Sequence, residues 1–272
     1  MRAYNPQIAV PTLKAFVFGD TSTGKTNLLA TAMDDVRTSP MLMLTCMGNP
    51  ESIRRRVTLP FIGELEATSD LNPVYEYLVN GQLETHPFAG KLKEMGWDPQ
   101  EHGPFKAIAL DSATEYQRIA LDEMTGNRSK RIGDDLKAPD RQMWGQALAR
   151  LTRVARLLYG LPNMSVFITA LEKRELEEAT GAYSMRPGLW GQADGEVPSY
   201  SLLTMRLTKV SSIPVVATRK QLEGTYNIGY IDQQAQVLGG EKYGGLPKEI
   251  PGPTIPKIMD YIYGPVTATA TK

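Results

Sequence analysis

The eight residues from Gly19 to Thr26 constrain the fold of this chain more than any other stretch. Their sequence, Gly-Asp-Thr-Ser-Thr-Gly-Lys-Thr, fits the pattern G-x-x-x-x-G-K-[ST] of a phosphate-binding P-loop. In such a loop, backbone N–H groups surround the phosphates, the lysine reaches the β- and γ-phosphates, and the final hydroxyl binds Mg²⁺. A pattern this short also arises by chance, so its surroundings decide its meaning.

The segments on either side have the character that a P-loop requires. Residues 14–18 (KAFVF) form a short apolar run rich in β-formers, and residues 26–33 are built of good helix formers. The start of a helix adds partial positive charge at the same place. We therefore predict a nucleoside triphosphate site contacted by Gly19, Asp20, Thr21, Ser22, Thr23, Gly24, Lys25, Thr26 and Asn27.

Composition sets the class of protein more loosely. A chain of 272 residues with 30 basic and 30 acidic side chains suits one α/β domain, and any nucleic-acid contact must come from a local patch. The single cysteine, Cys46, lies in an apolar run and is expected in a buried strand. No stretch reaches the length of a membrane span and the N-terminus has no apolar signal region, so we expect a cytoplasmic location and no membrane partner.

Alternating strand-like and helix-like segments indicate the fold class. Strands are predicted at 41–46, 105–110, 165–170 and 202–207, and helices at about 72–80, 113–124 and 141–159. This alternation predicts an α/β fold with a mostly parallel sheet flanked by helices, and ligands at the carboxyl ends of its strands. Residues 81–104 hold several glycines and prolines, and we expect a surface excursion there.

The C-terminal part is expected to add antiparallel structure. Strands are predicted at 215–219 and 226–231, joined by a turn at 223–224, and a helix at about 255–263. This gives an irregular lead-in over 1–12, a single domain over 13–263 with a C-terminal β extension, and a disordered tail over 264–272.

Asp111 ends the predicted strand 105–110, where a P-loop ATPase carries a carboxylate that holds Mg²⁺ through water. Its alternative role is a helix cap, which is compatible with the metal role. Thr26 and Asp111 are thus the predicted metal-site residues. The next residue is Ser112, where many hydrolysing P-loop proteins carry a glutamate.

The activating carboxylate must then come from elsewhere. Glu51 follows the second predicted strand and is the candidate general base, against the alternative of a solvated loop residue. Thr169 ends the fourth predicted strand and is a candidate sensor of the γ-phosphate, or a plain strand threonine. The candidate catalytic residues are Lys25, Glu51, Asp111 and Thr169.

The order of these segments resembles that of the RecA-like ATPases. More closely, it is similar to the core-only phage nucleotide-binding proteins related to RecA, some of which act as single-strand annealing recombinases. The segments that carry the resemblance are 19–26, the strand ending at Asp111 and Ser112, 166–175 (VFITALEKRE), 187–191 (PGLWG) and 243–247 (YGGLP). The resemblance spans about 13–263 and implies strand order 5-1-4-3-2, ATP and Mg²⁺ as cofactors, self-association into a ring or filament, and a host cytoplasm.

It also implies two loops that bind single-stranded DNA, here at 126–139 and 171–190. Basic side chains suit phosphate contacts, and occasional aromatic ones suit base stacking. The candidate DNA-binding residues are Arg128, Lys130, Arg131, Lys173 and Arg174, with Trp190 as a possible stacking residue. Both loops also carry acidic residues, so solvated surface loops are the alternative.

Two departures from the family affect the predicted mechanism. RecA carries a glutamine at the end of the fourth strand, whereas this chain has Thr169 and Ala170 there. Related proteins often have a Lys-Asp-Arg cluster before the Tyr-Gly-x-Leu-Pro segment, of which Glu241 and Lys242 remain. Lys242 and Arg219 are the candidates for a cation that reaches the γ-phosphate of a neighbouring subunit.

The leading hypothesis is a DNA-stimulated ATPase that binds single-stranded DNA as an oligomer in phage-type recombination or replication, with a single-strand binding protein as a further candidate partner. One alternative is a P-loop kinase that acts on a small molecule. Another is a slow ATP-dependent switch or loader that acts on a protein partner.

Overall fold

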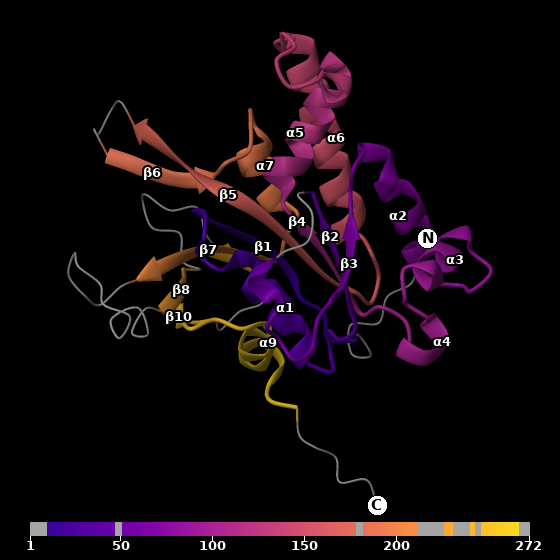
Figure 1. Cartoon of the computed structure of the whole chain (residues 1–272). Helices are drawn as coiled ribbons and strands as arrows, with labels where there is room; N and C mark the ends of the chain where they lie inside the picture. Colours follow the sequence, from indigo (N-terminus) through magenta and orange to yellow (C-terminus); the bar gives the residue numbers. More distant parts are fainter. Residues whose placement is uncertain are drawn as a thin grey trace, which may run out of the picture.

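A mixed β-sheet forms the centre of the molecule (Figure 1). The structure, a computed structural model, describes residues 10–46, 51–177, 182–210, 226–230, 240–242 and 246–266. The parallel strands are, in spatial order, β7 (Leu203–Val210), β1 (Lys14–Gly19), β5 (Ser165–Glu177), β4 (Ala107–Asp111), β2 (Met41–Thr45) and β3 (Phe61–Glu64). The predicted α/β class and the order 5-1-4-3-2 are confirmed, with β3 as an additional strand at the edge.

Antiparallel strands extend the sheet beyond β7. β8 (Tyr226–Tyr230) pairs with β7, and β10 (Glu249–Pro251) pairs with β8. β9 (Gly240–Glu241) pairs with the start of β7. The predicted C-terminal β extension is therefore present, while the predicted strand 215–219 and the turn at 223–224 lie outside the described residues.

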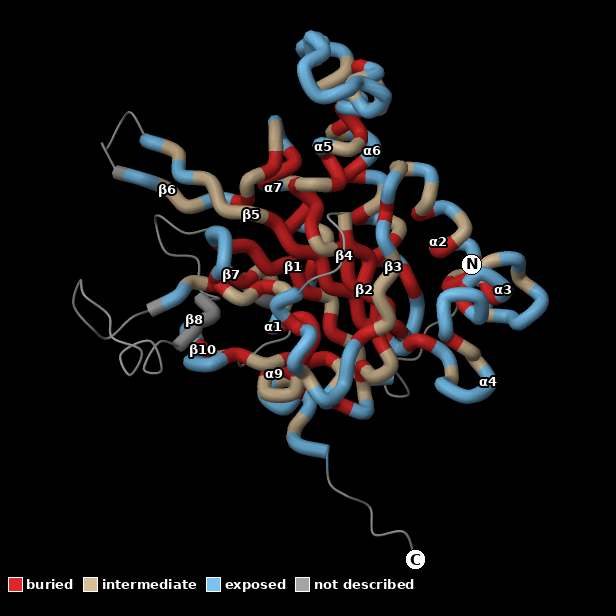
Figure 2. Tube along the Cα trace, in the orientation of Figure 1, coloured by how far each residue is buried: buried red, intermediate tan, exposed pale blue. Residues whose placement is uncertain are grey.

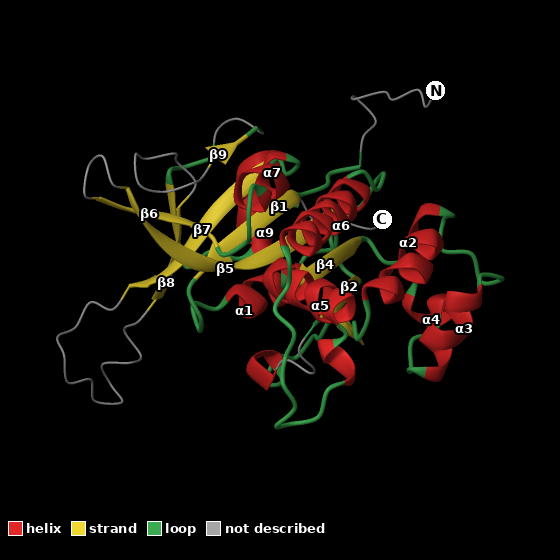
Figure 3. Cartoon of the chain, turned by 90° about the horizontal axis from the view of Figure 1, so that it is seen from above, coloured by secondary structure: helices red, strands yellow, loops and turns green. Residues whose placement is uncertain are grey.

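Helices cover both faces of the sheet because successive strand residues point to opposite sides. Phe16 and Phe18 pack in one core, whereas Ala15 and Val17 pack in the other. The first core is covered by α2 (Leu71–Val79), α5 (Ala113–Thr125), α6 (Arg141–Tyr159) and α7 (Ala193–Ser199). The second is covered by α1 (Lys25–Ala30) and α9 (Ile255–Tyr263). Figure 2 shows the strands as the buried centre of the molecule, and Figure 3 shows helices packed around the sheet.

The ends of the predicted helices follow from local capping. Ser112 Oγ accepts a hydrogen bond from the Glu115 N–H (3.4 Å), and Gly126, with a φ of 72°, caps the C-terminal end of α5. Asp140 Oδ1 accepts from the Met143 N–H (2.8 Å) at the start of α6. Short 3₁₀ helices occur at connections of the described chain: η2 (Thr31–Asp34), η3 (Glu51–Ile53), η4 (Thr68–Asp70) and η5 (Asn127–Ser129).

The stretch 81–104 differs from the surface excursion expected there. It contains two short helices, α3 (Pro87–Glu94) and α4 (Pro99–His102). Leu92 and Trp97 are buried in the first core, and the Trp97 ring stacks on Phe105 with centroids 4.6 Å apart. Glycines and prolines in and around these helices made the segment look irregular, although Leu92 and Trp97 are packed in the core.

β5 is longer than predicted, which corrects the interpretation of 171–190 as a loop. It continues to Glu177 and forms an antiparallel hairpin with β6 (Ala182–Pro187). In this β5–β6 hairpin, Lys173 lies opposite Arg186. The Glu175 carboxylate contacts both of their side chains, which offsets the repulsion between these two like charges. On the other face of the hairpin, Leu176 lies opposite Tyr183 and Arg174 lies opposite Met185.

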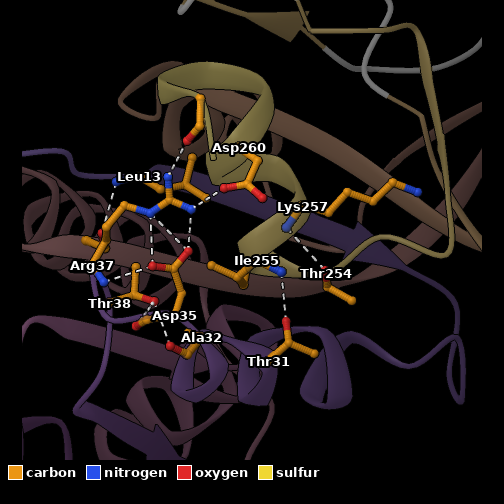
Figure 4. Close-up of polar contacts among 12 residues, drawn as sticks. Leu13, Thr31, Ala32, Asp35, Arg37, Thr38, Thr254, Ile255, Lys257 and Asp260 are labelled. Carbon is orange, nitrogen blue, oxygen red and sulfur yellow. Dashed lines mark hydrogen bonds and ion pairs between the residues drawn. The ribbon is translucent and has the colours of Figure 1, made fainter. Parts of the chain in front are cut away.

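Polar contacts fix the C-terminal helix to the second face of the sheet (Figure 4). The Ile255 N–H at the start of α9 donates to Thr31 Oγ1 (2.7 Å). Arg37 forms ion pairs with Asp35 and Asp260, both at 2.6 Å. The start of α9 is therefore held directly against the end of the P-loop helix. Within the described part of the chain, no helix has the length and apolar character to cross a lipid bilayer.

Candidate nucleotide-binding site

The P-loop joins β1 to α1, and two of its glycines are required by geometry. A Cβ on Gly19 would lie 2.2 Å from the carbonyl oxygen of Leu207 on β7, so a side chain has no room there. Gly24 has a φ of 91°, a left-handed conformation that glycine adopts without strain. These constraints explain the glycine spacing independently of any ligand.

Lys25 points back over the loop from the start of α1. Its side chain is nearly buried, and Nζ donates hydrogen bonds to the carbonyl oxygens of Gly19 (2.9 Å) and Asp20 (2.8 Å). Burial lowers the pKa of Lys25, and the negative charges of Asp111, Asp20 and Glu172 oppose this shift. The ammonium group is thus held among carboxylates at the carboxyl edge of the sheet.

Asp111 joins three separate segments at this edge. Its Oδ2 accepts a hydrogen bond from Thr26 Oγ1 on α1 (2.6 Å), and its Oδ1 accepts from Thr169 Oγ1 on β5 (2.5 Å). Parallel strands β4 and β5 are neighbours, so their carboxyl ends place the two side chains together. The structure therefore brings together Lys25, Thr26, Asp111 and Thr169.

The oxygen atoms of this cluster suit Mg²⁺, which prefers oxygen ligands and retains several waters. The Thr26 hydroxyl donates a hydrogen bond to the Asp111 carboxylate, so both groups present oxygen atoms at one point. These two side chains would hold the ion, which would supply positive charge to bound phosphates. Ser112 supplies no carboxylate here, and its hydroxyl instead caps α5.

Glu51 is not part of this cluster. It lies in η3, its side chain is 72 % exposed, and its carboxylate pairs with Arg54 Nη1 at 3.3 Å. Its role as general base stays a prediction.

An ion pair that the sequence interpretation missed lies beside the P-loop. Glu172 and Arg206 form a two-point contact, with Arg206 Nε 2.6 Å from one carboxylate oxygen and Nη2 3.0 Å from the other. Arg206 is in register with Phe18, and the residue before Glu172 is in register with Gly19. The pair therefore spans β1 where the chain enters the P-loop. The signal in the sequence was an acidic residue shortly after the predicted strand 165–170, on the side where ligands are expected.

The first predicted DNA-binding segment lies between α5 and α6. This α5–α6 tip, residues 126–140, projects from the body of the molecule (Figure 1). Lys130 and Arg131 are exposed there. Arg128 is also exposed but lies 3.7 Å from the carboxylates of both Glu66 and Glu123.

The second predicted DNA-binding segment is the β5–β6 hairpin. Arg174 is exposed, whereas Lys173 Nζ contacts Glu175 (2.6 Å) and Asp194 (3.2 Å). Trp190 packs edge-to-face on Trp144 with ring centroids 4.4 Å apart. The tryptophan is thus engaged in packing and not presented as a stacking platform.

The structure describes one of the two candidates for a trans-acting cation. Lys242 is exposed, and its Nζ donates to the carbonyl oxygens of Ser199 (2.9 Å) and Ser201 (3.0 Å) at the end of α7. Arg219 lies outside the described residues.

This sheet order, with a P-loop beside Asp111, defines a P-loop NTPase domain. The profile of a family described as AAA domain matches residues 12–220, and the chain belongs to this AAA domain family. Among solved structures, the flagellar accessory protein FlaH from Methanocaldococcus jannaschii is similar, with 12% sequence identity, 89% of this chain and 85% of that chain covered, and a TM-score of 0.36. No curated protein matches the sequence. Family membership supports nucleotide binding at the P-loop.

Proposed function

We propose that this protein binds ATP with Mg²⁺ at the P-loop and hydrolyses it. The observation that carries the proposal is the Asp111 carboxylate, which contacts both Thr26 and Thr169 beside Lys25. ATP is preferred to GTP because of the resemblance to RecA-like ATPases and because the sequence has no guanine-reading Asn/Thr-Lys-x-Asp motif. Bound Mg²⁺ would supply positive charge to the β- and γ-phosphates.

The chain's own residues have distinct roles in this proposal. Lys25 exchanges its two carbonyl partners for phosphate oxygens and stabilises the charge that develops on them. Thr26 and Asp111 hold the metal side of the site. Thr169 donates a hydrogen bond that keeps the Asp111 carboxylate in place and, when the γ-phosphate is present, can sense it. Glu51 remains the proposed base for the attacking water, either in the position that it has in the structure or after movement of η3.

We further propose that single-stranded DNA binds along the α5–α6 tip and the β5–β6 hairpin. Lys130, Arg131 and Arg174 are exposed on these projections and suit contacts to a phosphate backbone. Arg128 and Lys173 would join them by exchanging acidic partners for phosphates. Self-association into a ring or filament would line up these projections, and phage-type annealing or strand pairing is the process that the resemblance suggests.

A slow switch or loader is the second candidate function. It is favoured by Ser112, whose hydroxyl caps α5 at the position where many hydrolysing P-loop proteins have a glutamate. Such a protein would bind ATP tightly, turn it over slowly, and act through a protein partner.

ATP hydrolysis with and without single-stranded DNA, at two salt concentrations, tests these proposals. Stimulation by DNA that fades with salt is expected. The double variant Lys130→Ala/Arg131→Ala should lose the stimulation but keep the basal rate. The matched control Arg55→Ala/Lys91→Ala, which removes two exposed cations elsewhere, should keep both.

A DNA affinity unaltered in Lys130→Ala/Arg131→Ala would contradict the assignment of the tip. A basal rate that DNA does not change, with phosphate transfer to an added metabolite, would favour a kinase. Slow turnover that a protein partner accelerates would favour the switch.

A further inference from the structure

The outer part of the β5–β6 hairpin carries an exposed apolar patch. Leu176 on β5 lies directly opposite Tyr183 on β6, so the two side chains share one face of the hairpin. Leu176 is 54 % exposed and Tyr183 is 56 % exposed. Met185 lies on the same face, opposite Arg174. Neighbouring large apolar side chains on a projecting element are typical of a surface that contacts another protein.

A groove of about 710 Å³ lies between α2 and α6. Its apolar lining comes from both helices and from α5: Leu71 and Tyr75, then Val154, Leu157 and Leu158, and Tyr116. Arg150 also lines this α2–α6 groove, but it already pairs with Glu123 at 3.1 Å. The volume is within the range of sites that enclose drug-sized ligands, so the groove has room for two large side chains.

Charged side chains at the rim of the groove match the hairpin. Glu76 on α2 and Arg153 on α6 line the groove, and both are exposed. Arg174 on the hairpin is exposed as well. Within the part of the chain that the structure describes, none of these three side chains has an ion-pair partner. Arg174 can therefore pair with Glu76, and the Tyr183 hydroxyl can accept a hydrogen bond from Arg153.

The hairpin and the groove lie on opposite sides of the molecule (Figures 1 and 3), so they cannot meet within one copy. We propose that the β5–β6 hairpin of one copy binds in the α2–α6 groove of a second copy. Leu176 and Tyr183 enter the groove, and Arg174 pairs with Glu76 at its rim. This inference rests on the proposed self-association and adds the two surfaces that form it.

Such a contact joins two different surfaces, so each copy in a pair keeps one surface free for a further copy. Contacts of this type close into a ring or continue as a filament. From Leu171, where pairing with β1 ends, β5 runs about 20 Å to Glu177, which is long enough to enter a neighbouring subunit. In the assembly Arg174 serves this contact, and the proposed DNA contact of the hairpin falls to Lys173 on its opposite face.

Sedimentation velocity with Mg·ATP and without DNA tests the contact. The unaltered protein should form oligomers whose size grows with protein concentration. Leu176→Asp on the hairpin and Leu157→Asp in the groove should each weaken self-association at least about tenfold, because a charge replaces an apolar anchor at the centre of the contact. Leu83→Asp is the matched control, since Leu83 is also 56 % exposed but belongs to neither surface, and it should assemble normally.

A mixture of the two variants tests the head-to-tail geometry. Leu157→Asp keeps an intact hairpin and Leu176→Asp keeps an intact groove, so together they should form a dimer and nothing larger. An exchange of charges repeats the test with exposed residues only. Arg174→Glu and Glu76→Arg should each weaken assembly, because like charges then face each other, and the combined variant should recover it.

The outcomes separate this contact from the proposed function. Assembly that neither Leu176→Asp nor Glu76→Arg weakens would overturn the contact alone. Failure of both the mixture and the charge exchange to restore assembly would also overturn it. A protein that stays monomeric with Mg·ATP at every concentration would remove the contact and the proposed self-association together. Calorimetric titration of the same sample with Mg·ATP then shows separately whether the P-loop binds its nucleotide.

Discussion

Thr26 Oγ1 donates a hydrogen bond of 2.6 Å to Asp111 Oδ2, although 85 residues separate the two in sequence. The contact joins the first turn of the P-loop helix to the end of β4. Thr169 on β5 occupies the other carboxylate oxygen. The two hydroxyls therefore fix the carboxylate in one orientation at the edge where parallel strands present their ligand-binding ends.

The pKa of Lys25 predicts a pH dependence of ATP binding. Burial lowers this pKa below the ordinary lysine value of 10.5, so the free protein loses the ammonium charge at a lower pH than an exposed lysine would. Bound phosphates favour the charged form, and affinity should therefore fall as pH rises through the lowered pKa, with proton uptake on binding. Calorimetry in two buffers of different ionisation enthalpy, from pH 7 to pH 10, measures both effects.

Lys25→Arg is the control for this pH dependence, because arginine stays charged over the whole range. At pH 7 this variant should bind ATP as tightly as the unaltered protein or less tightly, and its affinity should change little with pH. A decline of equal steepness in this variant would assign the effect to another group.

Arg206→Ala should strongly destabilise the fold. Its partner Glu172 has a side chain only 4 % exposed, and removal of one member of a buried ion pair leaves the other charge without compensation. The expected loss is about 3–5 kcal/mol in the free energy of unfolding, measured with urea. The exposed pair Arg54–Glu51 supplies the control, since Arg54→Ala should cost less than about 1 kcal/mol. Similar small losses in both variants would contradict a structural role for the Glu172–Arg206 pair.

Arg37→Ala should loosen α9 from the rest of the domain. Arg37 bridges Asp35, which is nearly buried, and Asp260 on α9. Without it, hydrogen exchange of the α9 amides should speed up more than that of β4 or β5 amides. Unchanged protection of α9 would show that Thr31 and the apolar contacts hold the helix by themselves.

Cys46 should be unreactive in the folded protein. Burial, followed by the negative charges of Asp111 and Glu115, raises the pKa of its thiol to about 12, and only the thiolate reacts quickly. Labelling by a thiol reagent at pH 8 should be slow in buffer and fast in urea. Fast labelling of the folded protein would mean that the end of β2 is more open than the structure shows.

Local signals in the sequence predicted the elements that build the site. Short patterns placed three features where the structure has them: the P-loop glycines with Lys25, the apolar strand that ends at Asp111, and Thr169. Those patterns are local, and the parallel sheet then dictates that the strand ends meet. The strand order itself came from the resemblance to RecA-like ATPases.

Features that depend on distant partners were not predicted. The β5 half of the β5–β6 hairpin is rich in charged residues, so a cross-strand contact such as Arg186 with Glu175 is visible only once the strands are aligned. Glu172 and Arg206 lie on different strands, and nothing in either segment indicates the other. Leu92 and Trp97 are buried by α2 and β3, which no pattern between residues 81 and 104 could show.

The convergence of Thr26 and Asp111 is tested most directly by how much Mg²⁺ strengthens ATP binding in the unaltered protein and in Asp111→Asn. The unaltered protein should bind ATP far more tightly with Mg²⁺ than with a chelator. Asp111→Asn should lose about 10–100-fold of that strengthening and keep the metal-free affinity that Lys25 provides. An Asp111→Asn variant that retains the whole effect of Mg²⁺ would contradict the convergence of Thr26 and Asp111 on one metal-bound nucleotide.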